Sequence, residues 1–307
     1  MEFDVNLSRE KREAHTPVMP REVMELLSLP QGGTAVDGTL GLAGHAALIA
    51  QRLGPQGHLI GIDRDSTSLA EAKKRLAGYP LRMDLLKANF SELHRLLAQA
   101  KALAVDGILL DLGISSFQLD DARRGLSFQK EGPLDMRMDT TCGLTAAEII
   151  NTWPEEELAR IIWEFGEERF SRRIAKAIVY RRSTEKITTT QDLARLILTA
   201  LPRGYTRGKI HPATRTFQAL RITVNDEMGS LSRGLDACYE ALKPGGRLCV
   251  IAFHSLEDRI VKNKFRAAAD KGAVRLLTKK PLCPTDEECA VNTRSRSAKL
   301  RAIERVI

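Results

Sequence analysis

The sequence predicts an α/β fold in which a parallel sheet, covered by helices on both faces, is interrupted by an all-helical insert. Short apolar runs alternate with helical patterns up to about residue 120. No strand pattern occurs from about Asp121 to Gly208, and the α/β signals return at Lys243-Pro244-Gly245-Gly246. Because the helices that connect parallel strands lie on the faces of their sheet, this alternation indicates a sheet that is covered on both sides.

The predicted strands are short, rich in apolar residues and bounded by glycine or polar turns. They are Thr34–Gly38, His58–Asp63, Leu81–Asn89, Val105–Gly113, Arg247–Phe253 and Lys299–Ile307. The helices predicted among them are Ser66–Ala77 and Ser255–Ala268. Together with the strand-free region, this pattern predicts a discontinuous domain of residues 1–120 and 209–307 around a helical domain of residues 121–208.

Helix signals fill the insert. Thr145 with Glu148 matches the reciprocal capping pattern of a helix N-terminus. Thr152, followed by Pro154 and Glu155, matches the same pattern. Two more helices are predicted, Arg169–Arg182 with a dense basic face and Thr190–Leu201 before Pro202.

Composition bounds the class of function. The chain has 307 residues, 43% of them hydrophobic, but no run of about 18 apolar residues, so we expect no membrane span. The charged segment Met1–Glu13 lacks the apolar core of a secretory signal. Five cysteines show neither disulfide nor zinc-ligand spacing, so we expect reduced thiols, no metal and a cytoplasmic protein. A net charge of +8 favours a nucleic-acid partner, and an aromatic content of 5% leaves phosphate contacts to supply most of the affinity.

Two features at the ends of the first two strands predict an adenosine-containing ligand. Gly38, Gly41 and Gly44 follow the first strand, where glycine lets the backbone approach a ligand. Their spacing differs from the G-x-G-x-x-G of dinucleotide folds, and a purely structural turn is the alternative. Asp63 ends the second strand, where a carboxylate can accept hydrogen bonds from both ribose hydroxyls. Its alternative role is to cap the next helix, the role that we favour for Asp65.

The third and fourth strands also end in residues of interest. Phe90 follows the third strand and either flanks an adenine ring or packs in the core. Asp111 ends the fourth strand, and a carboxylate at the mouth of a central strand is costly unless it is solvated or paired. Four strand ends that each carry a polar or glycine cluster predict a ligand site more specifically than any one of them.

Several motifs are long and unusual enough to identify a family. In the α/β part they are His15–Val18, Asp37–His45, Asp63–Asp65, Asp111–Ser116, Phe253–Arg259 and Arg294–Ser297. In and next to the insert they are Gly132–Met138, Gly166–Arg169 and His211–Gln218. Through these motifs the sequence resembles, over nearly its whole length, the ribosomal small-subunit RNA cytosine-N4 methyltransferase family called RsmH or MraW.

The resemblance implies a Rossmann-like class I methyltransferase sheet with a helical insert, and S-adenosylmethionine as methyl donor. It implies N4-methylation of a cytidine in the decoding centre of 16S ribosomal RNA, within the small ribosomal subunit, and leaves a homodimer open. The cofactor contacts that it implies are Ala43, Gly44, His45, Asp63, Phe90, Asp111 and Gln118. Family members often carry another small pair at Leu42-Ala43, so only a backbone contact is expected of Ala43.

Asp111 is also the expected catalytic residue. The exocyclic amine of cytosine is a poor nucleophile because its lone pair is delocalised, and S-adenosylmethionine supplies a reactive sulfonium. The protein must align nitrogen, methyl and sulfur, and must accept an amine hydrogen. Many amino-methyltransferases have Asp-Pro-Pro-Tyr at this turn, whereas this chain has Asp111-Leu112-Gly113-Ile114, without the stacking aromatic. We therefore expect Asp111 to bind the cofactor first and to serve catalysis second.

Three other functions are weighed against this one. A hydrolase built on His254 and Ser255 lacks an evident orienting acid and oxyanion hole. Ser255 with Asp258 instead fits a helix cap, and His254 either faces the target base or serves the structure. The glycine spacing disfavours a nucleotide-binding oxidoreductase. The intact glycine turn with Asp63 disfavours a non-catalytic RNA-binding assembly factor on a methyltransferase scaffold.

The insert is the expected RNA-substrate domain. Its basic groups are Arg172-Arg173, Arg181-Arg182, and Arg203 and Arg207 with Lys209. A solvated helix face explains any single group equally well. Their concentration in the insert, near the substrate edge of the sheet, favours RNA.

Overall fold

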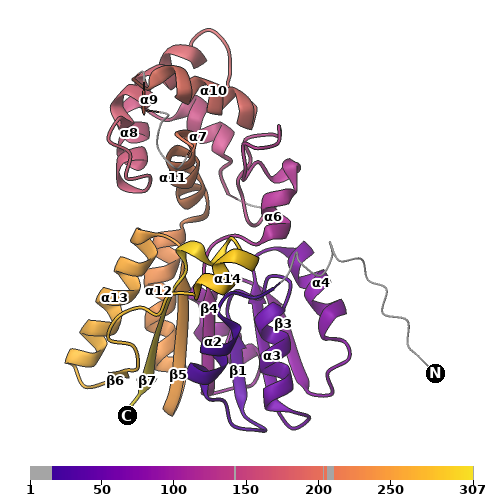
Figure 1. Cartoon of the computed structure of the whole chain (residues 1–307). Coiled ribbons are helices and arrows are strands. Elements are labelled where there is room, and N and C mark those ends of the chain that lie inside the picture. Colours follow the sequence, from indigo (N-terminus) through magenta and orange to yellow (C-terminus); the bar gives the residue numbers. More distant parts are fainter. Residues whose placement is uncertain (1–15, 142, 203, 206–210, 307) are drawn as a thin grey trace. The chain divides into compact units, whose positions relative to one another are not determined.

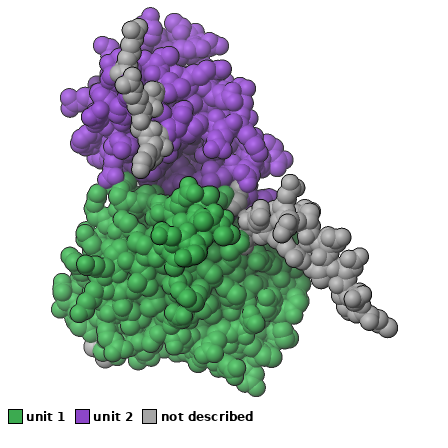
Figure 2. Space-filling view, in the orientation of Figure 1, with its two compact units in different colours: residues 1–113, 228–307 green, residues 114–227 purple. Residues whose placement is uncertain are grey.

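The computed structural model describes residues 16–141, 143–202, 204–205 and 211–306. The chain divides into unit 1, Met1–Gly113 with Met228–Ile307, and unit 2, Ile114–Glu227 (Figure 2). Cys238, Cys249, Cys283 and Cys289 are free, and Cys142 lies outside the described residues. No helix within the described ranges combines the length and the apolar content needed to cross a bilayer.

Unit 1 is built on a sheet of seven strands (Figure 1). The strands are β1 (Thr34–Asp37), β2 (His58–Asp63), β3 (Arg82–Lys87), β4 (Val105–Asp111), β5 (Leu242–Ala252), β6 (Val274–Leu276) and β7 (Lys299–Arg305). Their order is β3-β2-β1-β4-β5-β7-β6, and β1 to β5 run parallel. The sequence predicts these five and β7, whereas β6 and the antiparallel direction of β6 and β7 are findings of the structure.

Helices cover both faces of this sheet, which confirms the predicted α/β fold class. One face carries α2 (Pro20–Leu27), α3 (Gly44–Leu53) and α4 (Ser66–Leu76), and the other carries α5 (Leu93–Gln99), α12 (Glu227–Ala241) and α13 (Ser255–Asp270). Neighbouring residues of β4 serve opposite faces, since Ile108 packs in one core cluster and Leu109 in the other. A strand buried on both faces has no polar side, and this explains why the sequence shows continuous apolar runs.

The strand order changes direction between β1 and β4. The chain leaves β1 towards β2 and β3 on one side, while β4 and β5 lie on the other. Helices that follow such neighbouring strands on opposite faces leave a crevice at the carboxyl ends, where ligands bind in open α/β sheets. The glycine-rich segment 38–44 begins there, and Gly38 is closely packed, because an added Cβ would lie 2.5 Å from Cδ2 of Leu110.

Unit 2 is a helical body around its own apolar core. Its helices are α6 (Ser116–Asp120), α7 (Ala146–Thr152), α8 (Glu155–Glu164), α9 (Ser171–Arg182), α10 (Thr190–Ala200) and α11 (Ala213–Asn225). The predicted cap of α7 is present, with Thr145 accepting from the backbone of Glu148. The predicted cap at Thr152 is wrong. Thr152 still belongs to the last turn of α7 and donates to the carbonyl of Glu148, while α8 starts after Pro154 without a side-chain cap.

The limits of unit 2 differ from the predicted domain limits, residues 121 and 208. Phe217 and Leu220 of α11 lie in the core of unit 2, so the unit extends to Glu227. Ile114 and Leu119 pack against the same core, so the unit begins at residue 114. The sequence shows where the strand pattern stops, but it does not show which core a flanking helix joins.

Candidate functional site

The loop after β1 forms one side of the candidate site. Ala43, the N-cap of α3, has a φ of 61°, a left-handed conformation that costs a residue with a Cβ roughly 1–2 kcal/mol. It makes no side-chain cap, so the first N–H groups of α3, starting at Gly44, have no side-chain acceptor at the N-cap position. Uncapped N–H groups at the start of a helix favour an anionic group such as a carboxylate.

Asp63 fixes this loop to the end of β2. Its Oδ2 accepts from the backbone N–H of Gly41 at 2.7 Å, and its Oδ1 accepts from that of Asp65 at 2.8 Å. Burial raises the pKa of Asp63 to about 6, although these hydrogen bonds act in the opposite direction. A carboxylate has about four acceptor positions, so capacity for ribose hydroxyls remains. The helix cap is Asp65, which accepts from Thr67 at 3.0 Å, as the sequence favours.

Asp37 and Asp111 form a pair of acids at the ends of β1 and β4. Thr39 links them, because its N–H donates to Asp37 and its hydroxyl accepts from the N–H of Asp111. Burial raises the pKa of Asp37 to about 7 and that of Asp111 to about 8. Repulsion by Asp37 and then by Glu257 raises the pKa of Asp111 further. The sequence places Asp37 in a motif but gives it no role; its position at the end of a strand next to β4 is the signal that could have found it.

His45, in the first turn of α3, points towards Asp111. The ring Nε2 lies 3.7 Å from Oδ2 of Asp111, too far for a hydrogen bond. Burial lowers the pKa of His45 to about 4, against a smaller upward effect of the backbone of Val18. At neutral pH the imidazole is therefore uncharged and Asp111 is largely protonated, so the two do not form an ion pair.

Unsatisfied polar atoms gather at this site. Both ring nitrogens of His45 and Oδ1 of Asp111 are buried without a well-formed hydrogen bond to the described residues. Buried polar atoms in folded proteins almost always have a partner, and exceptions call for one from outside the chain. None of the three carboxylates, Asp37, Asp63 and Asp111, pairs with a lysine or arginine of the described residues. The site therefore suits a ligand with positive charge and hydrogen-bond donors.

Phe90 lies beside the same loop and is held from α12. Its ring fills the space left by Gly234, where an added Cβ would collide with the ring carbon Cδ2. One turn earlier on α12, the Ser230 hydroxyl accepts from the side chain of Asn89 at 2.9 Å. Phe90 is partly buried against the core, so its other side is available to a ligand. Sequence reasoning missed Ser230 and Gly234, although a glycine inside a helix is costly and signals close packing.

Gln118 does not join the other six predicted cofactor residues within unit 1. It lies on α6 in unit 2, where its side chain is buried. Its side-chain oxygen accepts from the N–H of Ser115, whose hydroxyl accepts from the N–H of Gln118. Within unit 2 this reciprocal pair is a helix cap, and the cofactor contact stays a prediction.

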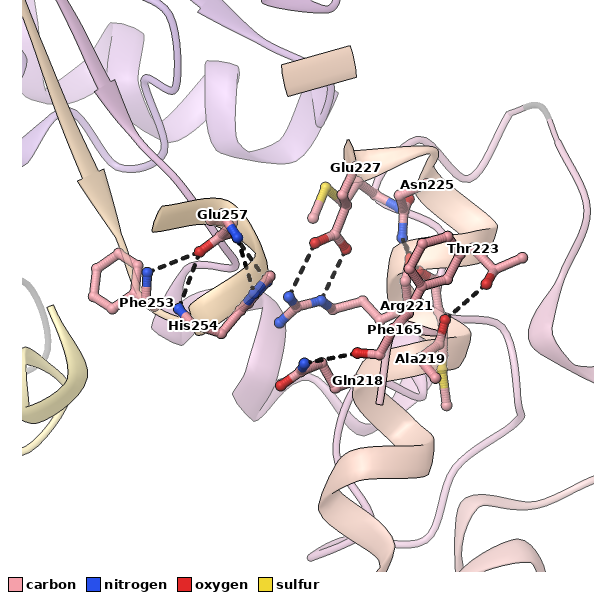
Figure 3. A network of polar contacts seen from close by, with 12 residues as sticks. Phe165, Gln218, Ala219, Arg221, Thr223, Asn225, Glu227, Phe253, His254 and Glu257 are labelled. Carbon is pink, nitrogen blue, oxygen red and sulfur yellow. Dashed lines mark hydrogen bonds and ion pairs between the residues drawn. The ribbon is translucent and has the colours of Figure 1, made fainter. Parts of the chain in front are cut away.

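The cap of α13 is His254 rather than Ser255, so the predicted helix cap at Ser255 is wrong. Nδ1 of His254 accepts from the N–H of Glu257 at 3.4 Å. The Glu257 carboxylate accepts in return from the N–H groups of Phe253 and His254 (Figure 3). Asp258 is engaged elsewhere, in an ion pair with Arg301 at 2.6 Å. With Nδ1 used in the cap, His254 has no orienting acid on that nitrogen, which removes the support for a hydrolase.

The predicted basic groups of the insert divide into two kinds. Arg182 donates to the carbonyls of Ile150 and Trp153, and Arg181 pairs with Glu185 at 2.7 Å. These two arginines therefore serve unit 2 itself. Arg172 and Arg173 are exposed without such partners. The third group, Arg203 and Arg207 with Lys209, lies outside the described residues, as does His15 of the first motif.

Comparison with known proteins identifies the family of this chain. The profile of the MraW methylase family matches residues 12–306. The chain belongs to this family. Two curated relatives are both named ribosomal RNA small subunit methyltransferase H. The relative from Syntrophotalea carbinolica is 51% identical, and the match covers 95% of this chain and 98% of that protein. The relative from Geobacter sulfurreducens is 53% identical, and the match covers 95% of this chain and 99% of that protein.

A solved structure is more distant. The crystal structure of a putative methyltransferase from Streptococcus mutans in complex with SAH has a TM-score of 0.46 and 11% identity, covering 95% of this chain and all of that one. A likeness at that level assigns no residue a role. Membership of the MraW methylase family, together with the sheet described above, confirms the predicted methyltransferase and its Rossmann-like fold.

Asp63→Ala tests the ribose contact. Loss of charge-assisted hydrogen bonds worth about 1.5–3 kcal/mol should weaken S-adenosylmethionine binding at least about tenfold in calorimetry. Asp65→Ala is the control, because it removes a helix cap worth about 1 kcal/mol of stability and leaves the affinity unchanged. Equal affinity of Asp63→Ala and the wild type would rule out the assignment.

Gly234→Ala tests whether α12 holds Phe90. In the wild type the new methyl group displaces the ring, so both the free energy of unfolding and the affinity for S-adenosylmethionine should fall. In a Phe90→Ala background the collision is gone, and the better helix propensity of alanine should raise the free energy of unfolding by up to about 1 kcal/mol. Denaturant unfolding and calorimetry on the four proteins measure both effects; the same sign in both backgrounds would contradict this packing.

Asp111→Asn tests the raised pKa. A carboxyl whose pKa is raised in the folded state contributes stability at low pH that is lost as the pH rises through about 8. The free energy of unfolding of the Asn variant should therefore rise relative to that of the wild type between pH 5 and 9. Denaturant unfolding measures both values. Asp258→Asn is the control, because the pKa of Asp258 is lowered and its difference should stay constant over that range. Parallel curves for Asp111→Asn and the wild type would contradict the raised pKa.

Proposed function

We propose that this chain transfers a methyl group from S-adenosylmethionine to N4 of a cytidine in the decoding centre of 16S ribosomal RNA. The family is a methylase family, and the names of its curated relatives support small-subunit ribosomal RNA as the substrate. The observation that carries the proposal is the acidic strand edge, where Asp37, Asp63 and Asp111 surround the glycine loop without a cationic partner among the described residues. The setting is the cytoplasm and the small ribosomal subunit, and a homodimer stays a prediction of the sequence.

The site fits S-adenosylmethionine in charge and in hydrogen bonding. The cofactor supplies an electrophilic methyl group on a sulfonium. Asp63 holds the ribose hydroxyls, the exposed side of Phe90 flanks the adenine, and the N–H groups at Gly44 and beyond donate to the carboxylate of the cofactor. The cofactor contact of Gln118 is proposed from the family resemblance alone.

Asp111 has two linked roles in this proposal. Protonated in the free protein, it becomes a carboxylate when positive charge enters the site, because a neighbouring cation lowers the pKa of an acid. A carboxylate at this position attracts the cation and can accept a hydrogen from the amine of the target base. The neutral imidazole of His45 adds no competing positive charge beside it.

The affinity for S-adenosylmethionine should then rise with pH. At higher pH, Asp111 is already ionised in a larger fraction of the free protein, so binding has to displace its proton less often. Calorimetry between pH 6 and 9 should show this rise for the sulfonium cofactor and a weaker one for the uncharged thioether product. Asp111→Asn should flatten the first curve towards the second. Equal slopes for both ligands in the wild type would exclude the proposed charge match.

Methyl transfer itself is tested with radiolabelled S-adenosylmethionine and either naked 16S RNA or small subunits, followed by nucleoside analysis. N4-methylcytidine is the expected product, and label in another nucleoside or none at all would overturn the proposal. At saturating cofactor, Asp111→Asn should lower turnover by about 10- to 1000-fold, the range for one lost electrostatic stabiliser. Turnover within about twofold of wild type would leave Asp111 as a binding residue only.

A further inference from the structure

Most cations in the described part of unit 2 form an ion pair or a hydrogen bond within that unit. Arg160 pairs with Glu157 and Glu164, and Arg182 is bound to two backbone carbonyls. The other cations with a carboxylate or carbonyl partner among the described residues are Arg123, Arg124, Lys130, Arg137, Arg181, Arg195, Arg215 and Arg221. Side chains engaged in this way are poor candidates for holding a partner molecule, because binding would first have to break the internal contact.

Three cations on α9 are different. Arg172, Arg173 and Lys176 are exposed, and none of them has an ion pair or hydrogen bond with any described residue. Just before α9, the guanidinium of Arg169 lies 4.7 Å from the ring centroid of Phe170 and 5.2 Å from that of Tyr205, so it is ordered but carries no counter-charge there. Apart from Lys186, the cations in the described part of unit 2 that lack an ion pair or hydrogen bond thus lie on one short stretch of chain.

An exposed aromatic side chain lies among these charges. Tyr180 of α9 is 79% exposed. At about 100° per residue, Arg172, Lys176, Tyr180 and Arg173 fall within an arc of about 100° of the helix. Ile174, Ala175 and Ile178 are buried on the opposite side, so this arc faces away from the core of unit 2.

We propose that this surface, the α9 face formed by Arg169, Arg172, Arg173, Lys176 and Tyr180, binds single-stranded RNA. The cations contact phosphates, and the ring of Tyr180 stacks on an unpaired base. An unpaired base is required because paired bases in a duplex leave no face open to an aromatic side chain. The inference rests on the proposed function. It names a surface that would contact the RNA substrate of that function.

Two variants separate the two kinds of contact. The triple variant Arg172→Ala, Arg173→Ala, Lys176→Ala should weaken binding of a fluorescent single-stranded RNA and lower the slope of log K against log salt by about 2, since each phosphate contact contributes about 0.7 on a single strand. Tyr180→Ala should weaken the same binding about tenfold without changing the slope, as expected for loss of one stacked base. Tyr180→Phe keeps the ring and should bind like the wild type.

The controls decide between charge in general and this surface. Lys271, Lys279 and Lys280 are exposed cations of unit 1, and their triple Ala variant has the same net charge as the α9 triple variant. It should keep the wild-type affinity and slope. An equal loss in both triple variants would overturn the proposal in favour of a diffuse charge effect. An equal affinity for polyglutamate would overturn it in favour of an acidic protein partner.

Cofactor calorimetry and methyl transfer separate this inference from the proposed function. Both triple variants and the Tyr180 variants should bind S-adenosylmethionine like the wild type, because none of the changed residues is a proposed cofactor contact. If the wild type methylates 16S RNA while the α9 variants bind RNA normally, the surface is wrong and the function stands. If the wild type binds but does not methylate RNA, and the α9 variants lose RNA binding, the proposed function is wrong and the surface stands.

Discussion

The candidate site depends on the cost of holding carboxyl groups at the ends of parallel strands without a cationic partner in the part of the chain that the structure describes. Asp37, Asp63 and Asp111 each end a parallel strand, and burial raises the pKa of all three. Water or a lysine could relieve this cost, but the neighbouring loop donates only the N–H groups of Thr39 and Gly41, to Asp37 and Asp63. The remaining electrostatic strain favours a cationic ligand, so a destabilising feature of the free protein becomes binding energy.

Hydrogen bonds to the strand-end acids hold the glycine-rich loop in place. Gly41 is tied to Asp63, and Thr39 is tied to both Asp37 and Asp111. These hydrogen bonds fix the start of α3, where Ala43 is kept in a left-handed conformation that an unconstrained alanine would leave. Rigid positions of this kind reduce the entropy that must be lost when a ligand binds.

Unit 2 uses its arginines for two purposes that local sequence does not distinguish. Arg182 satisfies carbonyls at the end of α7, as a structural residue, while Arg172 and Arg173 remain in solvent on the same helix. The difference follows from the helical period, because Arg182 lies on the side of α9 that carries the buried Ile174 and Ile178. Paired arginines in the sequence are therefore not equivalent in space.

The sequence by itself determined the strands β1 to β5 and β7 and the helical insert, because these depend on the local apolar period, and it predicted the cofactor residues from glycine spacing and family motifs. It also distinguished Asp65 as a helix cap from Asp63. Contacts between distant segments were decided only by the tertiary structure. Gly234 makes room for Phe90, His254 replaces Ser255 as the cap of α13, and α11 joins the core of unit 2. Such choices depend on which surfaces meet when the chain packs, and no local pattern records them.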